Sequence, residues 1–146
     1  MPDFIQLRES FEEADLLLRG IDKTKVKITG SYLWYPYWND IDCCTYSTDI
    51  AWALLKNAHK YRLKVDCKVV TKEQFDNIEH LMTFCNFCMC YYEGKLIKSY
   101  KFVNSQVLIE NLDSLDIFKD ITAIRKAYAK NIARGFLFKL DTEESY

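Results

Sequence analysis

The segment "LKVDCKVV" at residues 63–70 restricts the fold most narrowly, because it alternates apolar and charged residues along its length. Successive side chains of a β-strand point to opposite faces of the sheet. One face of this strand would carry Leu63, Val65, Cys67 and Val69, and the other would carry Lys64, Asp66 and Lys68. We therefore predict a strand here, in a sheet with one packed face and one polar face.

Other segments alternate between the period of a strand and that of a helix. Period-2 runs predict strands at residues 25–30 and 40–47, and a hairpin within residues 82–102 that turns at Glu93 and Gly94. Helical spacing predicts helices over Phe4–Arg19, from the Ser47 cap to Tyr61, over residues 71–81 and over Ser114–Arg134. This order indicates an α+β fold, in which a single mixed β-sheet is flanked by helices and followed by a C-terminal helix.

Length and composition limit the classes of protein to be considered. A chain of 146 residues with no repeat or Pro/Gly-rich linker fits one domain over residues 1–146, with a core at about 24–103 and a C-terminal helical part at about 113–136. The formal net charge of −1 excludes a chain that binds polyanions through its overall charge.

The sequence shows no signal peptide, and its longest uncharged apolar stretch, residues 81–92, is too short to span a bilayer. We expect a cytoplasmic chain that has no membrane partner and whose six cysteines are thiols.

Three aspartates are the candidates for chemistry. Asp40 and Asp42 are two residues apart on a predicted strand, so their side chains share a face, and Asp66 lies on the polar face of the next strand. If the two strands are neighbours, three carboxylates converge and repel one another. Mg²⁺ prefers such oxygen ligands and commonly combines them with substrate phosphates. Two such ions could hold the attacking and leaving oxygens of an in-line phosphoryl displacement.

A Gly-Ser pair precedes the aspartates. Gly30 and Ser31 follow a predicted strand directly, and a glycine followed by a small hydroxyl residue lets backbone N–H groups approach phosphate oxygens. Neither feature is specific alone. Their order is more specific: a strand, Gly-Ser, a short loop, Asp-hydrophobic-Asp, a helix, and a strand with a third aspartate.

In these features the sequence resembles the nucleotidyltransferase superfamily, which includes DNA polymerase beta and the minimal nucleotidyltransferases. The similarity rests on "ITGSYLWYPYWNDIDCC" and "LKVDCKVV", within residues 24–70, and more loosely on "AIRKAYAKNIARGF", within residues 113–136. The C-terminal stretch is similar to the basic helix of standalone nucleotidyltransferases common in phage genomes.

The resemblance implies a role for each matching residue. Gly30 and Ser31 would grip the nucleotide's phosphates, Asp40 and Asp42 would bind metal, and Asp66 would bind the catalytic metal and activate the acceptor. It implies Mg²⁺ (or Mn²⁺) as cofactor, an NTP as substrate, and transfer of its nucleoside monophosphate to an acceptor that is a small molecule, an RNA or a partner protein. The chain is short for a separate acceptor-binding domain, so a partner chain or the C-terminal helix would supply that surface.

The loop departs from the family pattern, because Tyr32 follows the serine and Trp34, Pro36 and Trp38 stand where small and basic residues are usual. Trp34, Tyr35 and Trp38 would either stack on a base or pack within the loop.

The basic row of the C-terminal helix, Lys126, Lys130 and Arg134, would either bind the nucleotide or form a solvated helix face.

Other interpretations stay open at this point. The aspartates would form a solvated turn, or Asp66 would pair with Lys64 or Lys68, if no metal binds. A domain of this fold would act without catalysis as a nucleotide-binding or partner-binding regulator, such as an antitoxin. A zinc module would use Cys85, Cys88 and Cys90, although buried thiols are the simpler interpretation.

Overall fold

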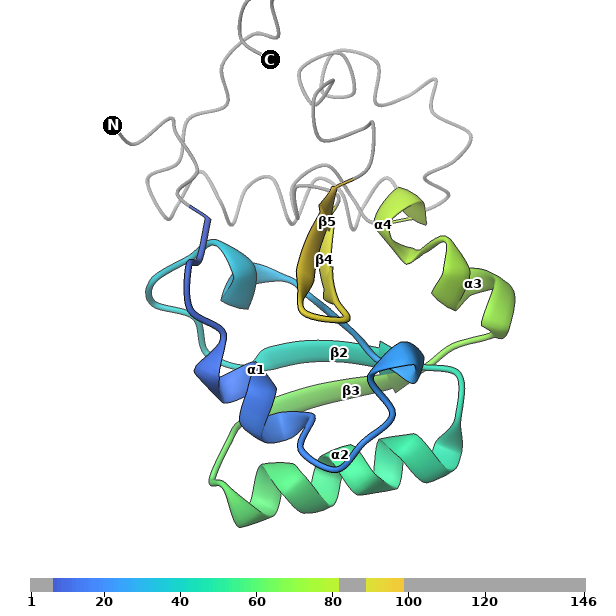
Figure 1. Cartoon of the computed structure of the whole chain (residues 1–146), viewed down its shortest axis with the longest axis horizontal. Helices are drawn as coiled ribbons and strands as arrows, with labels where there is room; N and C mark the ends of the chain where they lie inside the picture. The colour runs from blue at the N-terminus through green and yellow to red at the C-terminus, as the bar shows by residue number, and fades with distance from the viewer. Residues whose placement is uncertain (1–6, 82–88, 99–146) are drawn as a thin grey trace, which may run out of the picture. The chain divides into compact units, whose positions relative to one another are not determined.

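The structure of the protein is a computed structural model, and it describes residues 7–81 and 89–98 (Figure 1). Nearly all of these residues belong to one compact unit, Gln6–Ile78 together with Cys90–Ile97. The helical elements are α1 (Glu12–Leu17), η1 (Lys23–Lys25), η2 (Ser31–Leu33), α2 (Thr48–Lys60), α3 (Lys72–Asp76) and α4 (Ile78–Leu81). The strands are β1 (Lys27–Thr29), β2 (Ile41–Thr45), β3 (Val65–Val69), β4 (Met89–Tyr92) and β5 (Lys95–Lys98).

The strands form one mixed sheet in the order β3-β2-β1-β4-β5. β1 pairs antiparallel with both β2 and β4, whereas β2 and β3 are parallel. This confirms the predicted α+β class with a single mixed sheet. The nucleotidyltransferase-like core and the single-domain boundaries stay predictions, and the C-terminal helix at 113–136 lies outside the described residues.

Helix α2 makes the crossover that two parallel neighbours require, and it packs against β2 and β3 (Figure 1). The helix begins at Thr48 because the Ser47 side chain accepts a hydrogen bond from the backbone N–H of Ile50 at 3.3 Å. Leu54 and Ala58 of this helix are buried. The Asn57 amide donates to the carbonyls of Leu17 and Arg19, which joins α2 to the end of α1.

The predicted hairpin is confirmed at Glu93 and Gly94. Both residues have positive φ, 49° and 80°, as the tight turn between two antiparallel strands requires.

The N-terminal helix is shorter than predicted. The sequence pattern predicted Phe4–Arg19, but α1 covers only Glu12–Leu17, and Phe4 lies outside the described residues. The backbone N–H of Arg8 donates to the carbonyl of Leu33 at 2.8 Å. Phe11 stacks on Tyr91, with ring centroids 4.2 Å apart. Tertiary contacts thus take these residues out of the helix.

Two other predictions need correction. The helix predicted over 71–81 is divided at Asn77, whose φ of −118° and ψ of 16° end α3 before α4 begins. Val69 was expected on the packed face, but its side chain is 50% exposed at the end of β3, the first strand in the sheet order.

None of the described helices has the length and apolar character needed to cross a membrane.

We predict that Ser47→Ala lowers the free energy of unfolding by about 1 kcal/mol, because it removes the cap of α2. Urea denaturation monitored by circular dichroism measures this change. Lys56→Ala, at an exposed site on the same helix, is the matched control and should change stability by less than about 0.5 kcal/mol. Equal effects in the two variants would contradict a capping role.

Candidate metal and phosphate site

The structure brings the three predicted aspartates together. Asp42 on β2 is the direct register partner of Asp66 on β3, and Asp40 immediately precedes β2 on the face of Asp42. One carboxylate oxygen from each of the three lies within 4.8 Å of the others. Asp40 and Asp42 are half-buried and Asp66 is exposed. The geometric expectation is therefore confirmed, while the roles of these residues stay predictions.

The convergence has an electrostatic cost. Two unit charges about 4 Å apart repel by about 1 kcal/mol in bulk water and by about 4 kcal/mol at an effective dielectric constant of 20. Partial burial of Asp40 and Asp42 places the site between these limits. A divalent cation would offset the repulsion, and three carboxylates are a ligand set that suits Mg²⁺ or Mn²⁺.

Gly30 makes room for this cluster. It follows β1, whose last residue, Thr29, is the register partner of Asp42. A Cβ at Gly30 would lie 3.2 Å from Asp42 Cγ and still closer to Asp42 Oδ2. Gly30 also has φ of +83°, a conformation that L side chains rarely adopt. Backbone and carboxylate thus approach each other at a point where only glycine fits.

The backbone after Gly30 is fixed by a short 3₁₀ turn. The Gly30 carbonyl accepts from the N–H of Leu33 at 3.2 Å. The Ser31 carbonyl accepts from the N–H groups of Trp34 and Tyr35, at 3.1 and 2.7 Å. Ser31 is half-buried at the beginning of this turn. The predicted phosphate-binding pair therefore adjoins the carboxylate cluster directly.

The aromatic loop between Ser31 and Asp40 is packed in its first half. Tyr32 and Trp34 are buried, and the Tyr32 hydroxyl donates to Glu13 Oε1 at 3.0 Å while it accepts from the N–H of Ala14. Burial raises the pKa of Tyr32 far above that of a free phenol. Trp38 meets the Tyr32 ring edge to face at 4.9 Å. Of the two interpretations of this loop, packing holds for Trp34.

The cysteines of β2 and β3 lie behind the carboxylates. Cys43 is the register partner of Cys67, and alternation places this pair on the face opposite Asp42 and Asp66. Cys43 donates a hydrogen bond to Cys67, and this bond, together with burial, raises the pKa of Cys43 above that of a free thiol. The same bond lowers the pKa of Cys67. Cys43 and Cys44 are buried thiols, as expected, and Cys67 is half-buried.

Other candidates lie partly or wholly outside the described residues. Lys126, Lys130 and Arg134 are among these, as are Cys85 and Cys88 of the zinc hypothesis. Within residues 7–81 and 89–98, the group of metal-ligating side chains with suitable spacing is the aspartate cluster.

Lys64, which the sequence offered as a partner for Asp66, has its ammonium 3.2 Å from Asn39 Oδ1.

Arg8 is a residue that sequence analysis missed. Its Nε donates to the Tyr32 carbonyl at 2.6 Å, and its guanidinium lies 4.3 Å from the centroid of the Tyr32 ring. The helical pattern of the N-terminal segment gave no signal for this contact. Arg8 holds the residues before α1 against the loop that joins Ser31 to Asp40.

Comparisons with known proteins add no further assignment. No family model matches the chain, and neither a curated protein nor a solved structure matches it significantly.

We predict that Gly30→Ala is more destabilising than the same change at Gly20 or Gly94. All three glycines have φ between +73° and +83°, but a Cβ at Gly20 or Gly94 would meet no atom within 4 Å. The backbone conformation alone should cost about 1–2 kcal/mol at Gly20 and Gly94, and about 1–3 kcal/mol at Gly30, whose ψ of −165° lies in a region nearly confined to glycine. At Gly30 the displacement of Asp42 should add to this cost. Chemical denaturation of the three variants tests the difference, and equal losses would contradict the close approach.

We also predict that Asp66→Asn raises the free energy of unfolding in the absence of a divalent metal and lowers it, relative to the wild type, when Mg²⁺ is present. In a chelator, the variant should be more stable than the wild type by up to about 1 kcal/mol, because one repelling charge is removed. With Mg²⁺ at 100 times its Kd, the wild type should gain about 2.7 kcal/mol and the variant less.

Thermal unfolding with and without Mg²⁺ measures both effects. Asp76→Asn, at an exposed residue paired with Lys72, is the control and should gain as much as the wild type. A wild-type unfolding temperature that Mg²⁺ and Mn²⁺ leave unchanged would contradict a metal site.

Proposed function

We propose that the protein is a metal-dependent nucleotidyltransferase that transfers a nucleoside monophosphate from an NTP to an acceptor and releases pyrophosphate. The observation that carries the proposal is the close approach of Gly30 to the Asp42 carboxylate, within a cluster that also contains Asp40 and Asp66. A triphosphate at the Gly30-Ser31 bend would meet the carboxylates without any rearrangement of the strands.

Each side chain has a distinct task in this proposal. Asp40, Asp42 and Asp66 would hold Mg²⁺, which neutralises triphosphate charge and polarises the reacting phosphorus when it is bound. Ser31 and neighbouring backbone N–H groups would orient the phosphates. The register of β2 and β3 fixes Asp42 against Asp66 and thereby limits how far the carboxylates move during the reaction.

The chemistry requires one bond to form and one to break. An acceptor oxygen attacks the α-phosphorus, and the bond from that phosphorus to the oxygen bridging to the β-phosphate breaks, so that pyrophosphate leaves. If the acceptor is a hydroxyl, its proton must be removed, and Asp66 is suited to accept it because its carboxylate is the exposed member of the cluster. Exposure also lets an acceptor from solvent or from a partner chain reach this side of the cluster.

We predict that Asp42→Asn abolishes transfer of label from an α-labelled NTP while the fold is kept. Asparagine has nearly the same shape but lacks the charge that binds metal, and the side chain is only half-buried. Asp49→Asn, on the exposed first turn of α2, should retain transfer.

The assay measures labelled product and pyrophosphate, with circular dichroism as the test of folding. Full transfer activity in Asp42→Asn would overturn the assignment. Tight NTP binding with no release of pyrophosphate, across small-molecule, RNA and protein acceptors, would favour the non-catalytic nucleotide-binding domain.

A further inference from the structure

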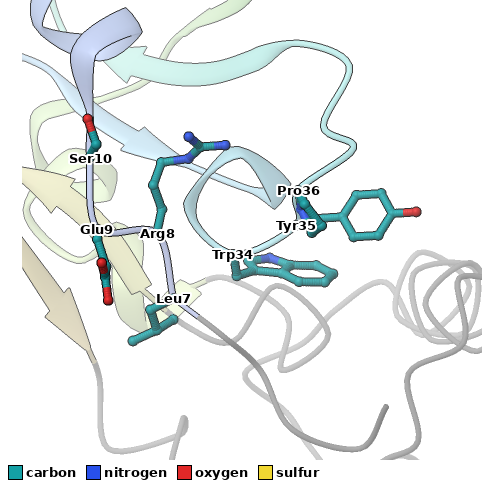
Figure 2. Close-up of a pocket in the computed structure, with 7 residues that line it drawn as sticks. All are labelled: Leu7, Arg8, Glu9, Ser10, Trp34, Tyr35 and Pro36. Atoms are coloured by element: carbon teal, nitrogen blue, oxygen red, sulfur yellow. The ribbon is translucent and has the colours of Figure 1, made fainter. Parts of the chain in front are cut away.

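A cavity of about 360 Å³ lies beside the aromatic loop, between segment 7–10 and loop residues 34–36 (Figure 2). Figure 2 shows the ring of Tyr35 and the side chains of Glu9 and Ser10 directed away from the gap, so these groups are not placed to bind a ligand there. Two thiols on β2 and β3, Cys43 and Cys67, are in contrast placed to react with each other.

Cys43 and Cys67 are direct register partners on the parallel strands β2 and β3. Their side chains leave the sheet on the same face, and the Cys43 thiol donates a hydrogen bond to Cys67. Neighbouring strands lie about 4.7–4.9 Å apart, and a disulfide requires Cα atoms about 4.4–6.8 Å apart. The pairing of the strands therefore already supplies the backbone spacing of a disulfide.

The ladder holds the two cysteines from both sides. The residues of β2 and β3 are in register from Ile41 with Val65 to Thr45 with Val69, and the cysteines form the middle pair. Helix α2 packs against both strands. Because the two sulfur atoms cannot separate without breaking this ladder, reaction within the pair is favoured over reaction with a thiol of another chain.

The two thiols differ in their access to solvent. Cys67 is half-buried on β3, the first strand in the sheet order, whereas Cys43 is only 3% exposed on β2, between β3 and β1. An oxidant from solvent therefore reaches Cys67 first. Redox-sensing cysteines are commonly accessible thiols that lie next to a second cysteine, which resolves the oxidised form. Cys67 and Cys43 have this arrangement.

We propose that Cys43 and Cys67 are a redox-active pair, which a peroxide converts into a disulfide across β2 and β3. The Cys67 thiolate attacks one peroxide oxygen, the O–O bond breaks, and the hydroxide that leaves takes up a proton to form water. Cys67 then carries a sulfenic acid. The sulfur of Cys43 attacks the sulfenic sulfur, the S–O bond breaks, and a second water leaves with the Cys43 proton. The two thiols lose two electrons in total, and the peroxide is reduced to water.

The resulting disulfide should be reduced readily. Two Cβ atoms on the same face of paired parallel strands lie about one strand spacing apart, whereas those of a disulfide lie about 3.8 Å apart, so they must approach by roughly 1 Å. Such strain makes a disulfide easier to reduce, and easily reduced disulfides are typically regulatory or catalytic. The pair would therefore cycle between thiols and disulfide.

The test maps the bond in the full chain. The reduced wild type would be treated with hydrogen peroxide, alkylated with N-ethylmaleimide during denaturation, and digested with trypsin without reduction. Mass spectrometry should find the peptide of residues 28–56 linked to that of residues 65–68, with fragment ions that join Cys67 to Cys43. Reduced glutathione at millimolar concentration, added before alkylation, should remove most of this link.

Cys43→Ala removes the resolving thiol, so sulfenic acid should persist at Cys67 and its labelling by dimedone should rise severalfold over the wild type. Cys44→Ala is the matched control, because Cys44 is the next residue on β2, is also buried, and lies on the opposite face of the strand from Cys43. It should form the link as the wild type does. Circular dichroism tests the folding of both variants, and the map of the wild type decides the question if either fails to fold.

Several results would overturn the inference: a link from Cys67 to another cysteine or to a second chain, sulfinic acid at Cys67 without a link, or no reaction of the folded wild type. A link between Cys43 and Cys67 that resists glutathione would mark a structural disulfide and overturn the assignment of a redox-active pair. The experiment uses neither nucleotide nor metal, so its outcome is independent of the proposed function.

Discussion

The close approach of the Gly30 backbone to the Asp42 side chain is the constraint on which the rest of the site depends. It follows from the antiparallel register of β1 and β2, which sets Thr29 opposite Asp42 and puts the chain reversal at the next residue. The same β2 residue pairs with Asp66 on its other side. One position on β2, which lies between β3 and β1, thus fixes both the bend and the third carboxylate, and a slip of one residue in either register would separate them.

The buried side of the sheet holds this register. Ile41 and Cys43, which flank Asp42, are buried, and β2 lies between β1 and β3 in the sheet. Apolar burial stabilises the strand by about 25 cal/mol per Å², which is the contribution that opposes repulsion among the carboxylates. The repulsion within the acidic cluster therefore destabilises β2 locally, and the packed residues on the other face of the strand offset this effect.

Sequence patterns anticipated the parts of the fold that depend on local periodicity. Alternation in residues 63–70 and the Ser47 cap located β3 and α2, and spacing alone placed Asp40 and Asp42 on one face. Contacts between distant segments were beyond such patterns. Lys27 alternates in sequence with the apolar residues Val26 and Ile28, yet it is only 5% exposed, because its ammonium donates to the Phe75 carbonyl and lies over the Phe75 ring. Residues 7–11 had helical spacing, yet hydrogen bonds of Arg8 to the loop outweighed it.

The contacts of the aromatic loop hold Ser31 and Asp40, which stand at its two ends, in fixed positions relative to each other. A flexible connection from Ser31 to Asp40 would lose conformational entropy each time phosphates and carboxylates were aligned. Here Tyr32 is anchored by Glu13, Ala14 and the Arg8 guanidinium, and Trp38 closes onto its ring. The entropy is therefore lost when the chain folds, and the geometry at the carboxylates is set before any ligand binds. If the proposed function holds, residues of the loop that never touch a phosphate would influence its binding, because they determine the positions of Ser31 and Asp40.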